Sequence, residues 1–296
     1  MIFHYLKIAF RNLCKHKTQN IISIIGLAVG LLCFCVCIYC SRFVESTDHC
    51  FANHDRIAEL NLYDGKADRY FSGSPVPLAE ELRTWALGET EAISSVTYPR
   101  ERPYYVELSP EKMLPYELET IEIDTCYNKI FTPEMVAGHW KMASQSLNSV
   151  ILSQSMAIKI FGNAESAIGK HMTLMRRLNT SPESTPKTGG IVYTIQAVMK
   201  DIPLNNSLDF MQNIDMLTVN DSEGLLQSPK RHNMTGANTY VLLSPQTTCT
   251  DLEKQFSKRD YTYTLYDEAY TVTASNMGSR LKKQGASYLG LVTGTV

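Results

Sequence analysis

The longest apolar stretch of the chain covers residues 21–40, IISIIGLAVGLLCFCVCIYC, and contains no charged side chain. Twenty helical residues, each rising about 1.5 Å, span the roughly 30 Å of a bilayer's hydrocarbon core. The stretch therefore predicts a transmembrane helix, which we bound at residues 19–43. Beyond it, apolar and polar positions alternate in short runs, as they do in a folded domain.

Small side chains recur along one face of this predicted helix. They follow alternating spacings of three and four residues, at Ser23, Gly26, Gly30, Cys33, Cys37 and Cys40. Such a seam lets a neighbouring backbone approach closely, and Gly26 with Gly30 forms a GxxxG pair. The seam predicts that another membrane helix packs here. The open alternative is a GxxxG pair without a partner, because membrane helices are rich in glycine in any case.

The charges that flank the apolar stretch predict its orientation. Only basic charges precede it, at Lys7, Arg11, Lys15 and Lys17, and the first acidic residue is Glu45. The positive-inside rule then places the N-terminus in the cytoplasm and the bulk of the chain outside. A cleaved signal peptide is the alternative, but the apolar run is too long for one and residues 39–43 offer no small-x-small cleavage site.

The first residues of the chain have a helical pattern of their own. Leu6, Phe10 and Leu13 recur at helical spacing, with basic side chains on the flank. This pattern is typical of a short helix that lies in the cytoplasmic interface, and we predict one over residues 1–18. A frayed basic leader is the alternative.

After the membrane stretch, strand signals alternate with a few helical segments. The predicted strands cover residues 57–62, 93–98, 104–108, 118–123, 149–152, 170–175, 191–199, 208–217 and 238–243, with one or two more in 261–273. The predicted helices cover residues 77–87, a segment that begins at Ser153 or Ser155 and runs through Ile160, and residues 250–256. The fold class is therefore α+β.

A compact block within this part of the chain predicts an inserted lobe. Residues 121–207 carry their own strand and helix signals, and similar signals recur on both sides. We therefore predict one lobe from residues 44–120 and 208–280, with residues 121–207 inserted. Gly162 follows the helix of the block as a C-terminal cap, and the polar tract 179–190 predicts an exposed hairpin tip or lid.

Composition argues against two classes of protein, nucleic-acid-binding proteins and disulfide-rich proteins. The chain of 296 residues has a net charge of −2, so no basic surplus favours nucleic acid. Beyond the membrane stretch there are three widely separated cysteines, Cys50, Cys126 and Cys249, which do not predict a disulfide framework, although a single bridge stays open.

The motifs of enzyme and metal chemistry are absent or incomplete. Residues 162–170, GNAESAIGK, have six residues between the glycines where a phosphate loop has four, and His171 replaces its Ser or Thr. His49, Cys50 and His54 lack the further ligands that would close a zinc site. Neither GxSxG nor HExxH occurs. We therefore predict no catalytic residue, no cofactor and no metal.

Four segments, in this order and spacing, resemble a known family. They are YLKIAFRNLCKHKTQNIISIIGLAVGL, DRIAEL, SVILSQSMAIKIFGNAESAIGKHMTL and YTIQAVMKDIPLNNS. Together they resemble ABC-transporter permeases of the MacB-like, FtsX-related class. The resemblance implies a membrane helix, then a periplasmic core with a porter-like lobe and an inserted lobe, in which Gly162 and Gly169 form a turn, and further membrane helices. The apolar residues within 281–296 are then the beginning of a second membrane helix; a C-terminal strand is the alternative.

The resemblance also implies a function. The chain is expected to be a permease-type subunit, or its N-terminal portion, of an ABC efflux or release system in the bacterial inner membrane. Its partners are expected to be a separate ATPase subunit, other permease helices or a second protomer, and envelope proteins. The alternative from another class is a single-pass anchored binding module without transport activity.

Overall fold

The computed structural model describes residue 5 and residues 17–71, 73–85, 87–109, 112–174, 190–209, 212–222, 224–226, 235–265 and 268–279. The chain divides into two compact units, of which the larger is the core, Thr47–Arg280. Three predicted features lie outside the described residues: most of the interfacial helix with Lys7, Arg11 and Lys15, nearly all of the tract 179–190, and residues 281–296.

The apolar stretch forms one long helix, α2 (Lys17–Glu45), of 29 residues. It extends beyond the predicted bounds of 19–43 at both ends and includes Lys17. Among the described residues it is the one helix long and apolar enough to cross a membrane. None of its residues is buried, and its large apolar side chains between Ile21 and Tyr39 are exposed.

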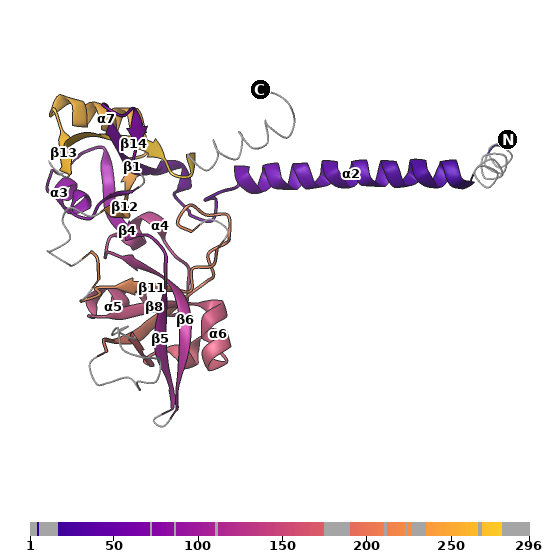
Figure 1. The fold of residues 1–296 in the computed structure, drawn as a ribbon. Coiled ribbons are helices and arrows are strands. Elements are labelled where there is room, and N and C mark those ends of the chain that lie inside the picture. Colours follow the sequence, from indigo (N-terminus) through magenta and orange to yellow (C-terminus); the bar gives the residue numbers. More distant parts are fainter. Residues whose placement is uncertain are drawn as a thin grey trace. The chain divides into compact units, whose positions relative to one another are not determined.

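One half of the core is an open antiparallel sheet, which we call the open lobe. Its strands run in the order β4-β12-β1-β14-β13. They are β1 (Ile57–Asp64), β4 (Thr90–Thr97), β12 (Thr235–Leu243), β13 (Thr262–Leu265) and β14 (Glu268–Asn276), with the short β2 (Arg69–Tyr70) and β3 (Ser74–Pro75) beside them. The helices α3 (Leu78–Thr84) and α7 (Cys249–Lys258) belong to this lobe, in the upper part of the core in Figure 1.

Apolar side chains of the open lobe join its sheet and helices in one core. On α7, Leu252 and Phe256 are buried in this core, and a capping box between Thr248 and Asp251 satisfies the first amides of the helix. From α3, Leu78 and Leu82 enter the same core. The period of 3.6 residues therefore places one face of each helix on the sheet.

The other half of the core is a closed ring of six strands, which we call the barrel lobe. The strands are β5 (Arg100–Ser109), β6 (Lys112–Ile123), β8 (Ser149–Ser153), β9 (His171–Leu174), β10 (Val192–Met199) and β11 (Met216–Val219). They pair in the order β11-β8-β10-β9-β5-β6, and β6 pairs again with β11. The pairs β10–β8 and β11–β6 are parallel. Closure pairs the two outermost strands of the series with each other.

Alternate residues of the ring face its interior. Buried side chains from all six strands form a single cluster, which contains Tyr104, Val106, Leu118, Val150, Leu152, Met172, Tyr193, Ile195 and Met216. The rings of Tyr104 and Tyr193 meet edge to face at 5.8 Å. Helix α6 (Gln154–Phe161) adds Met156 and Ile160 to this cluster. The barrel is therefore filled by side chains.

A third apolar cluster lies between the two lobes. The outward residues Ile121, Ile151 and Leu217 of the ring pack there with residues of the open lobe such as Tyr240. The short helices α4 (Tyr127–Phe131) and α5 (Trp140–Gln145) contribute to it, and β7 (Met135–Gly138) pairs with β10 nearby. In Figure 1, α4 lies between the strands of the two lobes.

The predicted fold class is confirmed: an apolar N-terminal helix precedes a mixed, strand-rich core. The predicted strand over residues 208–217 is wrong, because the strand begins only at Met216. Leu208 and Ile214 are instead buried from a connecting segment in the cluster between the lobes. The division into lobes stays a prediction, and its boundary at residues 120 and 121 falls inside β6, all of which belongs to the ring.

Candidate functional site

The small residues of the predicted seam all lie on α2. They are Ser23, Gly26, Gly30, Cys33, Cys37 and Cys40, and their side-chain positions are exposed or nearly so. A Cβ atom added at Gly26 or Gly30 would meet no described atom within 4 Å. The seam therefore has room for the backbone of another helix, and the identity of that helix stays a prediction.

Gly162 and Gly169 bracket the connection between α6 and β9. Both have left-handed backbone conformations, with φ of +85° and +78°. The amide of Gly162 donates to the carbonyl of Ile158, which ends α6, and the amide of Gly169 donates to the carbonyl of Ile195 on β10. At the start of the helix, Ser153 is the N-cap and accepts a hydrogen bond from the amide of Met156.

The histidines and the cysteine that follow α2 do not form a metal-binding site. The rings of His49 and His54 lie 4.4 Å apart, and His54 Nδ1 lies 3.1 Å from the carbonyl of Phe51. Within the described part of the chain, no three His, Cys, Asp or Glu side chains are placed to hold a metal ion. Partial loss of water around its thiol, with the charge of Asp48, raises the pKa of the exposed Cys50 to about 11, so this cysteine is a poor nucleophile at neutral pH.

Asp48 forms a buried junction just after α2 in the chain. Its side chain is 2% exposed and its φ is +69°, in the left-handed region. One carboxylate oxygen accepts from the amide of Ser207 at 2.6 Å, and the other accepts from the hydroxyl of Ser207 at 2.5 Å. The amide of Asp48 donates to the carbonyl of Asn205 at 2.9 Å. Asp48 thus fixes the segment that follows β10.

The end of β14 meets the same carboxylate. Gly278 has a φ of +71°, and a Cβ atom added there would lie only 2.2 Å from Asp48 Oδ2. One residue earlier, the amide of Met277 donates to the carbonyl of Ile57, at the start of β1. Three segments far apart in sequence therefore meet at Asp48, and we call this arrangement the Asp48 junction.

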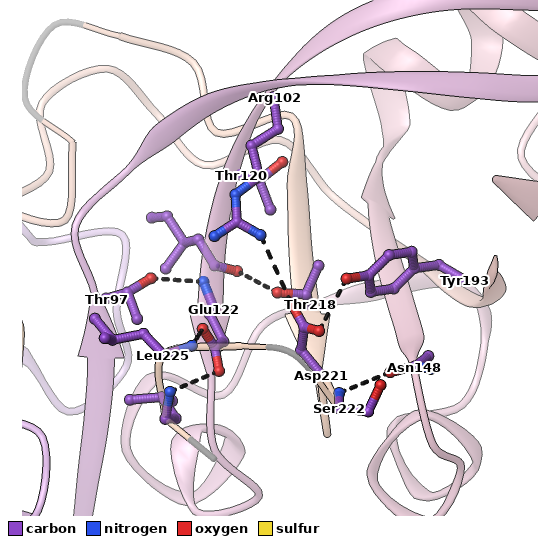
Figure 2. Close-up of polar contacts among 12 residues, drawn as sticks. Thr97, Arg102, Thr120, Glu122, Asn148, Tyr193, Thr218, Asp221, Ser222 and Leu225 are labelled. Atoms are coloured by element: carbon purple, nitrogen blue, oxygen red, sulfur yellow. Dashed lines mark hydrogen bonds and ion pairs between the residues drawn. The ribbon is translucent and has the colours of Figure 1, made fainter. Parts of the chain in front are cut away.

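A group of polar residues occupies one end of the barrel interior, as Figure 2 shows. Glu122, on β6, is 3% exposed. Its carboxylate accepts hydrogen bonds from the amides of Leu225 at 2.6 Å and Leu226 at 2.8 Å. Its own amide donates to the hydroxyl of Thr97 at 2.9 Å, at the end of β4. Burial raises the pKa of Glu122 to about 7.

Asp221, which follows β11, completes this polar end. Its side chain is 1% exposed and accepts from the hydroxyl of Tyr193 at 2.9 Å. Its other carboxylate oxygen lies 3.7 Å from a guanidinium nitrogen of Arg102 on β5. Next to it, the amide of Ser222 donates to Asn148. These contacts attach Asp221, Leu225 and Leu226 to the strands of the barrel.

The sequence did not single out Asp48, Glu122 or Asp221. Asp48 stands in a polar run just after the membrane stretch, and nothing in the spacing links it to Ser207. For Glu122 a signal exists: in the period of two along β6, it occupies the same face as the buried Leu118 and Thr120. A charged residue on the buried face of a strand calls for partners.

Sequence comparisons find no matching family profile and no matching curated protein. Among solved structures, the chain is similar to a domain of a protein from Porphyromonas gingivalis that is named as a permease. The TM-score is 0.56 and the identity 21%, and the match covers 77% of this chain and 93% of that one. The core therefore shares the fold of that domain.

Two further solved structures are similar at lower TM-scores. The periplasmic region of MacB from Actinobacillus actinomycetemcomitans has a TM-score of 0.48 and 13% identity, over 80% of this chain and 94% of that one. The extracellular domain of the noncanonic ABC-type transporter YknZ from Gram-positive bacteria has a TM-score of 0.45 and 11% identity, over 74% and 100%. The resemblance predicted from the sequence is confirmed at the level of the fold by the domain from Porphyromonas gingivalis.

Proposed function

We propose that the chain is a permease-type subunit, or the N-terminal portion of one, of an ABC efflux or release system in a bacterial inner membrane. In this proposal α2 spans the membrane with its N-terminus in the cytoplasm, and the core lies outside. The fold shared with the domain from Porphyromonas gingivalis and the long apolar helix before it both support this assignment. The buried carboxylates of Asp48 and Glu122 accept hydrogen bonds from backbone amides, and in this proposal they hold segments of the core in place.

The proposed mechanism, in which the membrane helices transmit work to the core, rests on the Asp48 junction. A separate ATPase would supply the work, and the membrane helices would pass it to the core. Asp48 follows α2 closely and holds Ser207 by two charge-assisted hydrogen bonds, while Gly278 packs on the same carboxylate. A displacement of the chain at Asp48 would therefore move the segment after β10 and the end of β14 together.

The seam of α2 supplies the contact within the membrane. Another permease helix or a second protomer would pack against Gly26 and Gly30, because these positions leave room for a neighbouring backbone. Association in lipid depends on such close packing, since the apolar side chains gain nothing by leaving lipid for another helix.

Replacing Gly26 and Gly30 together with leucine is expected to abolish this association while the helix still inserts. The double change Leu27→Ile and Leu31→Ile, on another part of the helix surface, is the matched control and should leave association unchanged. Disulfide crosslinking in native membranes reports the face: Cys33 and Cys37 should crosslink and Cys35 should not. Efficient crosslinking through Cys35 alone would show that the contact lies on another face of the helix than the predicted seam, and would contradict the prediction.

The test of the proposed function is copurification from native membranes in mild detergent. We expect an ATPase subunit to be recovered with the full chain, and its ATP hydrolysis rate to change when Asp48 is replaced by alanine. Recovery of the chain without any ATPase subunit, in detergents that keep other ABC complexes intact, would contradict the proposal and favour an anchored binding module.

A further inference from the structure

The sheet of the open lobe ends in a strand with a free edge. β13 is the last strand in the order β4-β12-β1-β14-β13, and among the described strands it pairs with β14 alone. Figure 1 shows it at the margin of the open lobe. Its residues Thr262 and Thr264 have exposed side chains. A free edge presents unpaired N–H and C=O groups, to which another strand can bond.

The register of the sheet shows which backbone groups of β13 are unpaired. The amide of Met277, just after β14, donates to the carbonyl of the first residue of β1, so the odd-numbered residues of β14 bond to β1. Its even-numbered residues, such as Tyr270 opposite Tyr263, therefore bond to β13. The alternation directs the N–H and C=O groups of Thr262 and Thr264 away from β14. Within the described part of the chain, these groups have no backbone partner.

The free edge of β6, in the barrel lobe, is protected against such pairing. Glu119 directs its amide and carbonyl away from β5, toward Asp215. Pro115 lies four residues earlier and so faces the same way, but it has no N–H group to donate. Lys112 and Glu117, which are both exposed, add charges beside it. Proline and charged side chains at an edge discourage pairing with another chain.

The outer edge of β4 is also protected, because side chains already bond to it. Arg83 Nε donates to the carbonyl of Ile93 at 2.9 Å, and the amide of Ser95 donates to the carboxylate of Asp124 at 2.8 Å. β13 has neither kind of protection. Residues 261–265, YTYTL, contain no charge, no proline and no glycine, and tyrosine and threonine favour strands.

The sequence of β13 is complementary to itself. In an antiparallel pair centred on Tyr263, Thr262 of one copy lies opposite Thr264 of the other, and each such pair exchanges both of its N–H···O bonds. No charged side chain faces another, because the strand has none. The threonines meet on the exposed face, and the two Tyr263 rings meet on the face that carries the helices.

We propose that β13 pairs with β13 of a second copy of this chain, so that two open lobes form one continuous sheet across a two-fold axis. This contact is separate from the packing of α2 in the membrane. A dimer held by α2 alone leaves the amides of Thr262 and Thr264 open to water, whereas pairing of β13 places them in hydrogen bonds. The state of these two amides therefore reports this contact and not the other.

Hydrogen exchange of the full chain in detergent tests the pairing. We expect the amides of Thr262 and Thr264 to exchange at least about tenfold more slowly than their intrinsic rates. Thr262→Lys combined with Thr264→Lys puts like charges opposite each other, so this protection should be lost. Thr262→Glu combined with Thr264→Glu should lose it for the same reason. When the two double variants are coexpressed, lysine faces glutamate and the protection should return, which only a contact between copies can produce.

Thr262→Lys combined with Thr264→Glu is the matched control. It changes the same exposed positions, but each lysine then faces a glutamate of the second copy, so protection should equal that of the wild type. Fast exchange of both wild-type amides would overturn the proposal. Protection that persists in the double lysine variant would overturn it as well, because the edge would then be covered by something other than a second β13. None of these outcomes depends on an ATPase subunit, so this contact and the proposed function fail separately.

Discussion

Replacement of Asp48 with alanine is expected to lower the free energy of unfolding of the core by about 3 kcal/mol. The variant leaves the amide and the hydroxyl of Ser207 without their charged acceptor in a site where Asp48 is 2% exposed. Hydrogen bonds to a charged group contribute roughly 1.5–3 kcal/mol each, and a buried donor left unpaired costs about as much. Denaturant unfolding of the full chain in detergent, followed by tyrosine and tryptophan fluorescence, measures the change.

Asparagine at position 48 is the matched control. Its amide oxygen can accept from the Ser207 amide, the Ser207 hydroxyl can turn to accept from its nitrogen, and asparagine tolerates a φ of +69°. We therefore expect Asp48→Asn to lose less than half as much stability as Asp48→Ala. Equal unfolding midpoints for the wild type and both variants would show that the junction contributes nothing to the core.

Replacement of Asp124 with alanine is expected to cost about 4 kcal/mol, the largest effect of a single side chain that we predict. Asp124 follows β6 directly, beside the pair Val96–Ile123 that joins β4 of the open lobe to β6 of the barrel lobe. Its oxygens accept from the hydroxyl of Ser94 at 2.7 Å, the amide of Ser95 at 2.8 Å and the amide of Cys126 at 2.9 Å, and it pairs with the guanidinium of Arg83. The same unfolding measurement applies.

Ser94→Ala is the control for Asp124, because it removes one of the four donors and leaves the carboxylate in place. It should cost about 1 kcal/mol, as the loss of one hydrogen bond does. If both variants lower the free energy of unfolding by the same amount, the amides and the arginine around Asp124 must find other partners without it. Its position between the lobes would then contribute nothing to stability.

The elements that the sequence predicted are those with a strong local pattern. An uncharged run was enough to predict the membrane helix. Alternating apolar and polar residues, with turn residues at the ends, were enough to predict strands such as β1 and β10. The helices α4 and α5, of five and six residues, are too short to show a period of 3.6. The strand predicted over residues 208–217 was wrong because the apolar character of Leu208 and Ile214 reflects their burial between the lobes.

The candidate sites could not be predicted in the same way. Asp48 and Ser207 are 159 positions apart, and only the completed sheet order brings them together. A carboxylate that accepts from backbone amides, as Glu122 does from Leu225, leaves no mark in the sequence of its partner. By contrast, the small residues at Gly26 and Gly30 could be found at once, since a seam on one helix is a local pattern.

The sheet order also determines which strands can pair first while the chain is being synthesised. The first strand, β1, pairs with β12 and β14, which lie near the far end of the core, so it must wait for almost the whole domain to emerge. All strands of the barrel lobe, from β5 to β11, emerge before β12 and can close their ring without it. Pairing across such sequence distances is slow, and β1 stays open to wrong partners until then. The nascent chain should therefore depend on a holding chaperone most strongly in the interval between the completion of β11 and the arrival of β14.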